Sequence, residues 1–237
     1  MLSEPTAPAT IPRLPWDEFL HGFAWRQGEH VTLIGPTGAG KTTLALALLP
    51  LRRYVLALAT KPKDRTMDKL VRSRSWRLVR TWDNMPNVLG SACRVVFWPR
   101  YRTPDDEPAQ AVEIARAMNG AFAQGGWCLF VDELWWVERK LGLSRMVESW
   151  FTQGRSVGLS MIVGSQRPAH ISLLAYDQAT HVFFWRENDE ANLKRIAGLN
   201  GLKSRIVRET VATLPKHAVL YVNTNTGAMI VTQAPAP

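Results

Sequence analysis

The residues from Gly35 to Thr42 are the strongest candidates for chemistry in this sequence. They read Gly-Pro-Thr-Gly-Ala-Gly-Lys-Thr and fill every position of the phosphate-binding pattern G-x-x-x-x-G-K-[ST]. Glycines let successive backbone N–H groups turn toward one concavity, Lys41 neutralises β- and γ-phosphate charge, and the Thr42 hydroxyl can ligate Mg²⁺. This P-loop predicts that ATP and Mg²⁺ are the cofactors. The predicted nucleotide contacts are Gly35, Pro36, Thr37, Gly38, Ala39, Gly40, Lys41, Thr42 and Thr43.

Two adjacent carboxylates supply the second part of the candidate site. Asp132 and Glu133 follow the apolar run at 127–131, which is typical of a buried strand. In P-loop nucleotide hydrolases the first such carboxylate holds Mg²⁺, and a second one can polarise the attacking water. We therefore expect Thr42 and Asp132 to form the metal site, and Glu133 to act with Lys41 in catalysis.

Gln166 is the third candidate. It follows the apolar run at 159–163, which predicts a further strand. A strand inserted between the P-loop strand and the strand that ends in Asp132 would carry Gln166 to the γ-phosphate. The sequence therefore predicts a catalytic role for Gln166.

The elements needed to position these residues follow from the hydrophobic pattern. Run-on apolar segments predict buried strands of a parallel sheet, and apolar residues at helical spacing predict helices between them. Two late strands around a turn predict a C-terminal β-hairpin. The expected fold is α/β, a P-loop NTPase of the RecA-like (ASCE) type with a mostly parallel sheet flanked by helices. The predicted strands are 31–34, 54–59, 77–82, 93–98, 127–131, 159–163, 180–185, 218–222 and 228–232; the predicted helices are 43–49, 104–125, 143–151 and 190–199.

Composition sets the expected domain organisation and location. Four prolines within residues 1–15 favour an extended N-terminal arm, followed by one ATPase domain at 16–232 and a tail at 233–237. No apolar stretch approaches the roughly 20 residues of a membrane helix, so we expect no membrane insertion. Cys93 and Cys128 lie in apolar runs without metal-site spacing and predict buried thiols. We expect a cytoplasmic protein, in the host cytoplasm if the chain is viral.

Basic residues outnumber acidic ones by 29 to 20, which gives a formal charge of +9. A field of this sign attracts polyanions, above all nucleic acid. The loop after the second strand carries Lys61, Lys63 and Arg65, and Arg72 and Arg74 follow. We expect the first three to contact DNA phosphates; the alternative is an ordinary solvated loop. No helix-turn-helix, zinc-finger or RNP signature points to base readout.

Three motifs in order carry a resemblance to a known family. The P-loop, the run Val131-Asp132-Glu133, and the segment Gly154-Arg155 to Gly158 followed by Gln166-Arg167-Pro168 resemble the FtsK/HerA superfamily of ring-forming DNA-pumping ATPases. The small ATPases that package viral genomes look most similar. The resemblance implies that Arg155 is an arginine finger reaching a neighbouring subunit's nucleotide, with Arg167 as a second candidate, and that the loop 60–65 faces the channel of the ring.

The function that these features predict is ATP-driven translocation of double-stranded DNA by a homo-oligomeric ring, a pentamer or a hexamer, most similar to a viral genome-packaging motor. A capsid vertex or portal is a candidate docking partner. The alternatives are a HerA-like helicase or a plasmid or conjugation pump. A nucleotide-gated binding protein or a small-molecule kinase represents a different class. Glu133 argues against the first of these, because a protein that only binds ATP needs no water-activating carboxylate.

Overall fold

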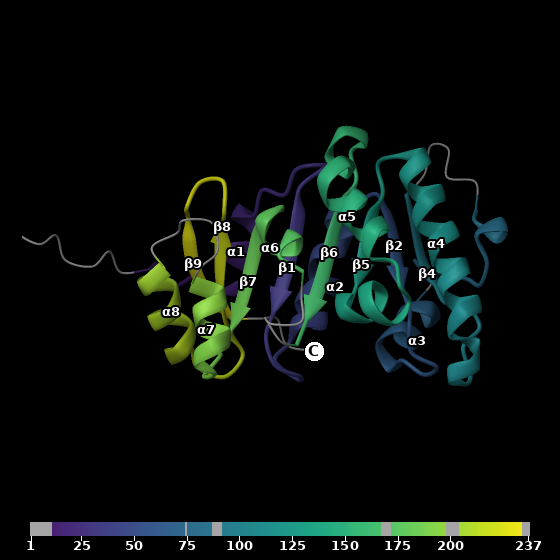
Figure 1. Ribbon diagram of the computed structural model, residues 1–237. Helices are drawn as coiled ribbons and strands as arrows, with labels where there is room; N and C mark the ends of the chain where they lie inside the picture. Colours follow the sequence, from purple (N-terminus) through teal and green to yellow (C-terminus); the bar gives the residue numbers. More distant parts are fainter. Residues whose placement is uncertain (1–10, 74, 87–91, 167–171, 198–203, 234–237) are drawn as a thin grey trace, which may run out of the picture.

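The computed structural model describes residues 11–73, 75–86, 92–166, 172–197 and 204–233. Its centre is a nine-stranded sheet with the strand order β3-β4-β2-β5-β6-β1-β7-β8-β9 (Figure 1). The first seven strands in chain order run parallel, and β8 and β9 pair antiparallel at one end. The strands are β1 His30–Ile34, β2 Tyr54–Leu58, β3 Arg77–Val79, β4 Cys93–Phe97, β5 Cys128–Val131, β6 Ser160–Ser165, β7 Ala179–Trp185, β8 Ala218–Asn223 and β9 Met229–Gln233.

Helices cover both faces of the sheet, which explains why β1, β5, β6 and β7 are buried along their whole length. One core layer contains side chains from α4, α5, α7 and α8, and the other contains side chains from α1, α2 and α3. The α-helices are α1 Trp16–Gly22, α2 Lys41–Leu48, α3 Arg65–Arg72, α4 Glu107–Gln124, α5 Ser144–Gln153, α6 Leu174–Asp177, α7 Glu190–Ala197 and α8 Ser204–Thr213. Short 3₁₀ segments are η1 Leu49–Leu51, η2 Trp82–Asn84, η3 Pro104–Asp106 and η5 Gly154–Val157, and η4 Trp136–Lys140 is a π-helix.

The strand order confirms the predicted place of β6. It lies between β5 and β1, so Val131 at the end of β5 pairs with Val163, and Ile34 at the end of β1 pairs with Ser165. The segments that follow these three strands therefore leave the same edge of the sheet. They are the P-loop, the Asp132-Glu133 pair and Gln166, and the parallel topology alone brings them together.

Four of the observed α-helices, α1, α3, α6 and α8, were absent from the sequence-based prediction. The segment read as a basic loop continues into α3, whose N-cap is Asp64: its Oδ1 accepts hydrogen bonds from the backbone N–H groups of Thr66 at 2.9 Å and Met67 at 3.1 Å. Helix α8 buries Val207 and Val211, which lie four residues apart. The N-cap residue Asp64 and the apolar pair Val207 and Val211 can both be recognised in the sequence.

The predicted N-terminal arm is described only from residue 11 onward. Pro12 accepts a backbone hydrogen bond from Val231 at 2.9 Å, and Leu14 donates one to Val231 at 3.0 Å. The segment therefore follows the outer edge of β9 in an extended conformation. At the other end of the chain, Gln233 belongs to β9, one residue later than the predicted end of that strand.

Candidate nucleotide-binding site

The P-loop connects β1 to α2 in the way that the motif requires. Gly38 and Gly40 adopt positive φ angles of 76° and 109°, which L side chains disfavour, so glycine at both positions lets the loop curl around a concavity. Helix α2 starts at Lys41, immediately after the loop. Its first N–H groups lack intrahelical acceptors and attract an anion.

Lys41 is buried beneath the loop. Its Nζ donates hydrogen bonds to the carbonyl oxygens of Gly35 at 2.6 Å and Pro36 at 2.9 Å. Burial lowers the pKa of Lys41, and the nearby carboxylates of Asp132 and Glu133 oppose that shift. The ammonium group is therefore held at the phosphate-binding loop, near the predicted metal ligand Asp132 and the predicted catalytic residue Glu133.

Thr42 and Asp132 form the candidate metal site. The Thr42 hydroxyl donates a 2.7 Å hydrogen bond to Oδ1 of Asp132, which joins the start of α2 to the end of β5. Oxygen ligands of this kind suit Mg²⁺, which is usually held by one or two protein groups together with phosphate oxygens and water. The described residues contain no cluster of three or more His, Cys, Asp or Glu residues that could hold a metal alone. The two oxygen ligands of Thr42 and Asp132 fit a cation that takes its remaining ligands from phosphate oxygens and water.

The position of Asp132 depends on a close contact with Gly164, a residue that no sequence motif marks. A Cβ atom on Gly164 of β6 would lie 2.3 Å from the backbone carbonyl oxygen of Asp132. Real Cβ atoms do not approach a carbonyl oxygen so closely, so only glycine lets these neighbouring strands meet here. Gly164 thereby sets the position of the predicted metal ligand.

Glu133 and Gln166 meet next to the P-loop. The Thr37 hydroxyl donates a 2.8 Å hydrogen bond to Oε1 of Gln166, and the side chain of Gln166 also hydrogen-bonds the carboxylate of Glu133. Burial raises the pKa of Glu133, Lys41 lowers it and Asp132 raises it. Gln166 thus connects the loop to the predicted base, as its place at the end of β6 suggested.

The structure places Lys61 at this site as well. Its Nζ lies 3.7 Å from Oδ2 of Asp132, and its backbone carbonyl accepts a 2.9 Å hydrogen bond from the Trp98 indole N–H. Lys61 was predicted to contact DNA, but its amine faces the candidate metal site. The reason is the pairing of β2 with β5, which brings the ends of both strands together.

The other predicted DNA contacts lie nearby on the surface. Lys63 is exposed in the loop after β2, Arg65 begins α3, and Arg72 ends it. Arg74 and Arg167 lie outside the described residues. Lys63 and Arg65 therefore remain predicted DNA contacts at the carboxyl edge of the sheet.

Arg155 occupies the opposite edge of the sheet from the P-loop of its own chain. It lies in η5 ahead of β6, and its Cγ is 3.2 Å from the position that a Cβ on Gly28 would take. Gly28 precedes β1, whereas the P-loop follows β1, and β1 and β6 run parallel. The length of a strand separates the exposed Arg155 from its own nucleotide site.

Both predicted thiols, Cys93 and Cys128, are buried. Burial raises the pKa of the Cys128 thiol to about 12 and that of Cys93 in the same direction, so neither is an activated nucleophile. Within the described residues, no helix has the length and apolar character to cross a bilayer.

No family model and no curated protein matches the sequence. Solved structures do match its fold. The DNA-packaging ATPase B204 from Sulfolobus turreted icosahedral virus superposes with a TM-score of 0.64 at 19% identity, over 90% of this chain and 100% of that one. This chain has the P-loop NTPase fold. B204 from Sulfolobus turreted icosahedral virus 2 in complex with ATP-gammaS gives 0.62 at 16% identity, over 86% and 95% of the two chains.

The fold is not confined to viral proteins. VirB4 of Thermoanaerobacter pseudethanolicus superposes with a TM-score of 0.65 at 14% identity, over 88% of this chain and 89% of that one. Sequence identities of 14–19% show a shared fold. They do not show a shared chemistry. The predicted α/β fold with a C-terminal hairpin is confirmed.

Proposed function

We propose that the protein hydrolyses ATP at the carboxyl edge of its sheet. The observation that carries this proposal is the hydrogen-bonded chain from Thr37 through Gln166 to Glu133, beside the Thr42–Asp132 pair. A protein that only binds nucleotide needs the P-loop, but it does not need a half-buried carboxylate held in place beside the γ-phosphate position. A kinase would use that position for an acceptor substrate.

Each residue has a distinct task in this proposal. The P-loop N–H groups and Lys41 would hold the phosphates, and Thr42 and Asp132 would hold Mg²⁺, which would neutralise phosphate charge. Glu133 accepts a hydrogen bond from the attacking water and orients it. Gln166 positions the Glu133 carboxylate through their shared hydrogen bond.

We further propose that the nucleotide site is completed by a neighbouring copy in a ring. Arg155 cannot reach its own P-loop, because the two lie at opposite edges of the sheet. A copy that presents its amino edge to the carboxyl edge of the next copy would carry Arg155 to the phosphates there. Such head-to-tail contacts close into rings, pentamers and hexamers among them.

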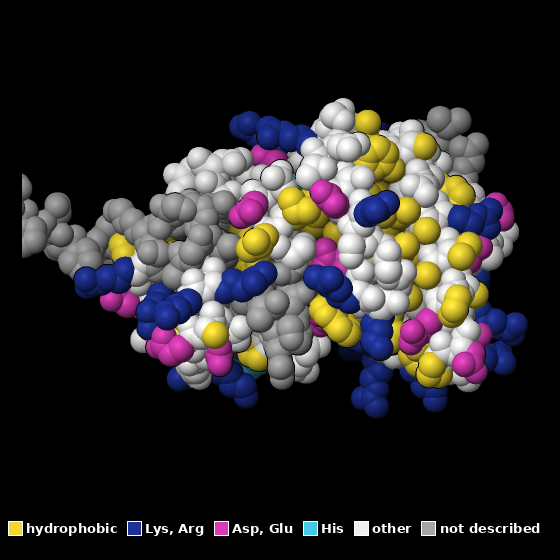
Figure 2. All heavy atoms as spheres, viewed as in Figure 1, with side chains coloured by type: hydrophobic (Ala, Val, Ile, Leu, Met, Phe, Trp, Pro, Cys, Tyr) yellow, Lys and Arg dark blue, Asp and Glu magenta, His cyan; other side chains and the backbone are white. Residues whose placement is uncertain are grey.

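The proposed cargo is double-stranded DNA, gripped through its phosphates. Lys and Arg side chains project from the lower edge of the molecule in Figure 2, where the parallel strands of Figure 1 end. Lys63 and Arg65 lie on the loop and helix that leave this edge. Phosphate contacts suffice for a pump that must move along any sequence.

Packaging of a viral genome is the proposed role, with a capsid vertex or portal as the docking partner. The supporting observation is that this chain covers the complete length of the packaging ATPase B204. A conjugation pump is the second candidate, because the TM-score for VirB4 is equally high. The same ATP chemistry serves both.

The test is a steady-state ATPase assay with and without duplex DNA. Wild type should hydrolyse ATP and should be stimulated by DNA. Lys41→Ala should lose nucleotide affinity and turnover together, whereas Glu133→Gln should bind ATP normally and lose about 10²-fold or more in turnover. Turnover near the wild-type level in Glu133→Gln would remove Glu133 from the catalytic role.

A further inference from the structure

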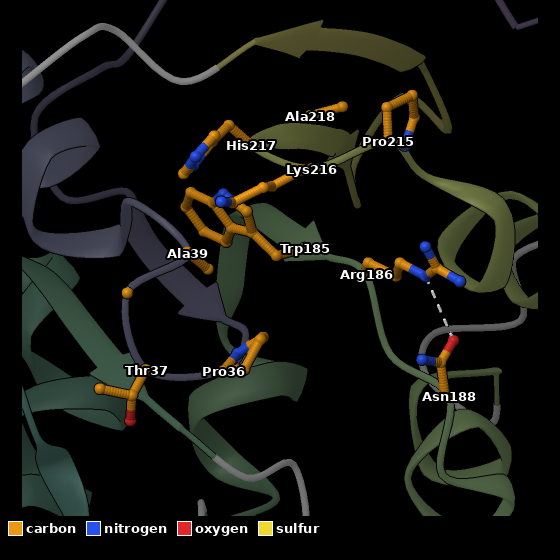
Figure 3. Close-up of a pocket in the computed structure, with 11 residues that line it drawn as sticks. Pro36, Thr37, Ala39, Trp185, Arg186, Asn188, Pro215, Lys216, His217 and Ala218 are labelled. Atoms are coloured by element: carbon orange, nitrogen blue, oxygen red, sulfur yellow. Dashed lines mark hydrogen bonds between the residues drawn. The ribbon is translucent and has the colours of Figure 1, made fainter.

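A network of hydrogen bonds that the proposed ATP chemistry does not use lies at the edge of the sheet opposite the P-loop. The P-loop and the end of β7 lie at the carboxyl edge (Figure 3), whereas residues 25–29 lead into β1 at the amino edge. The turns 125–126 and 154–158 lead into β5 and β6, which run parallel to β1, so both turns also lie at the amino edge. Arg155 belongs to the second of these turns, and the network therefore bears on how Arg155 is presented.

A single side-chain amide joins these segments. Nε2 of Gln27 donates a 2.9 Å hydrogen bond to the carbonyl oxygen of Gly126 and a second hydrogen bond to the carbonyl oxygen of Gly158. Oε1 of Gln27 accepts a 3.1 Å hydrogen bond from Nη1 of Arg52, which precedes β2. The amide thus connects the approach to β1, the turn between α4 and β5, and the turn that carries Arg155.

The chemistry of these partners fixes the direction in which the Gln27 amide faces. A guanidinium group can only donate and a backbone carbonyl can only accept, so Oε1 faces Arg52 and Nε2 faces the two turns. Arg52 is itself held in place: it is buried, its Cζ lies 3.7 Å from the centre of the Trp25 ring, and its Nη2 donates a 2.5 Å hydrogen bond to the carbonyl oxygen of Arg26. The orientation of Gln27 is therefore set before any partner binds.

The turn that carries Arg155 is held from two sides. On one side, a Cβ on Gly28 would lie 3.2 Å from Cγ of Arg155, and the N–H of Gly28 donates a 3.1 Å hydrogen bond to Oγ of Ser160. On the other side, the N–H of Gly126 donates a 2.9 Å hydrogen bond to the carbonyl oxygen of Val157. These contacts fix the backbone of the turn and the first part of the Arg155 side chain.

The end of the Arg155 side chain remains available to another molecule. Arg155 is exposed, and among the described residues no carboxylate forms an ion pair with it. A long side chain whose stem is already held loses less rotamer freedom when its guanidinium group binds a phosphate. Holding the turn therefore lowers the entropic cost of a contact between Arg155 and a nucleotide outside its own subunit.

We propose that Gln27 is a positioning residue for Arg155. Its amide holds the turn 154–158 against the turn between α4 and β5, so that each subunit presents Arg155 to its neighbour in one defined position. The inference rests on the proposed function, because Arg155 must act on the neighbour's nucleotide. Gln27 precedes β1 and the P-loop follows β1, so the two lie at opposite edges of the sheet. Loss of the amide should therefore lower turnover and leave ATP binding by the same subunit intact.

The experiment changes the hydrogen bonding of this side chain with little change in its size. In Gln27→Glu the carboxylate still accepts from Arg52, but it cannot donate to the carbonyl oxygens of the two turns. Gln27→Met is a neutral second variant that removes the amide altogether. Gln178→Glu is the matched control, because Gln178 is also exposed at the amino edge, immediately before β7, and its side chain makes no hydrogen bond to any described residue.

Both Gln27 variants should bind ATP with Mg²⁺ at wild-type affinity in calorimetry and should form assemblies of wild-type size. Their ATP turnover should fall by about 10- to 100-fold, whereas Gln178→Glu should match wild type. Mixing under conditions where subunits exchange then identifies the cause. Lys41→Ala subunits keep Arg155, so they should restore part of the turnover of Gln27→Glu, and Arg155→Ala subunits should restore none.

Wild-type turnover in both Gln27 variants, together with an inactive Arg155→Ala, would overturn the positioning role alone. The role is also overturned if both Gln27 variants fail to assemble, or if Lys41→Ala restores Arg155→Ala but not Gln27→Glu, because the defect then lies in assembly or in the subunit's own site. If wild type hydrolyses no ATP, or if Arg155→Ala keeps wild-type turnover, the proposed function or its shared site fails first, and the role of Gln27 fails with it.

Discussion

The Nζ atom of Lys61 lies 3.7 Å from Oδ2 of Asp132, so the loop after β2 carries a positive charge to the candidate Mg²⁺ site. The same carboxylate accepts the Thr42 hydroxyl hydrogen bond through its other oxygen. A divalent cation bound between Thr42 and Asp132 would meet the Lys61 ammonium as a like charge. We therefore expect the conformation of the loop 60–64 to depend on occupation of the metal site.

Lys61→Ala should lower the Mg²⁺ concentration that gives half-maximal ATPase activity, because it removes this like charge. The Lys61 side chain is 52% exposed, so solvent screens the effect, and we expect a change of about two- to fivefold. Lys63→Ala changes the same charge on the same loop and serves as the matched control. Equal Mg²⁺ dependence in Lys61→Ala and Lys63→Ala would show that Lys61 does not act on the metal site.

Gly164→Ala should damage the nucleotide site without touching any of its side chains. The added Cβ would lie 2.3 Å from the Asp132 carbonyl oxygen, so the end of β5 must move. Asp132 would then shift relative to Thr42, and ATP turnover should fall by about tenfold or more. Gly22→Ala, where a Cβ meets nothing within 4 Å, is the control. Normal turnover in a folded Gly164→Ala protein would contradict the positioning role.

The stability of the fold should decrease between pH 7 and pH 5 because of His30. The pKa of His30 is lowered to about 4, chiefly by burial; the backbone of Phe151 opposes this shift, and the positive charge of Arg155 contributes to it. The unfolded chain takes up a proton near pH 6.5, and the folded one does not until about pH 4. Between these values the unfolded state binds more protons, so the free energy of unfolding falls as the pH falls.

For this single group the loss from pH 7 to pH 5 amounts to about 2 kcal/mol. Urea unfolding of wild type and His30→Asn at both pH values measures it, since other titrating groups contribute to both proteins alike. The wild-type free energy should decrease by about 2 kcal/mol more than that of the variant. Parallel decreases in the two proteins would exclude His30 as the cause.

Arg155→Ala should bind ATP normally and lose turnover. An arginine supplied to a neighbour's site contributes about 10³–10⁵ in rate in GTPase systems, and it does not contact the nucleotide of its own subunit. Lys41→Ala has the opposite defect, since it loses its own site and keeps its arginine. Mixing the two inactive variants under conditions where subunits exchange should restore part of the activity. If the assembled Arg155→Ala protein hydrolyses ATP at the wild-type rate, Arg155 is an ordinary surface residue and takes no part in a neighbour's site.

Much of the fold was predictable because the strands are buried on both faces. Their run-on apolar sequences differ from the amphipathic pattern of the helices, and the P-loop fixes the direction of β1. Because parallel strands end at the same edge of a sheet, Asp132, Glu133 and Gln166 could be predicted to lie together at the carboxyl edge. Helix α3 escaped prediction because its basic residues suggested a loop, although Asp64 is an ordinary N-cap signal.

Other features depend on contacts that the sequence does not reveal. Lys61 reaches Asp132 only because β2 pairs with β5, and no local pattern encodes that pairing. In the sequence, Gly164 looks like an ordinary strand residue. Its close contact with the Asp132 carbonyl oxygen is visible only in the structure.

The most direct test of a DNA motor is movement along the duplex. A short third strand bound to the far end of a duplex is displaced when a translocating protein runs into it, and its release is followed by gel electrophoresis. Wild type with ATP and Mg²⁺ should release the third strand progressively, and Glu133→Gln should bind the duplex without releasing it. Wild-type protein that hydrolyses ATP on this DNA but never displaces the third strand would contradict the account.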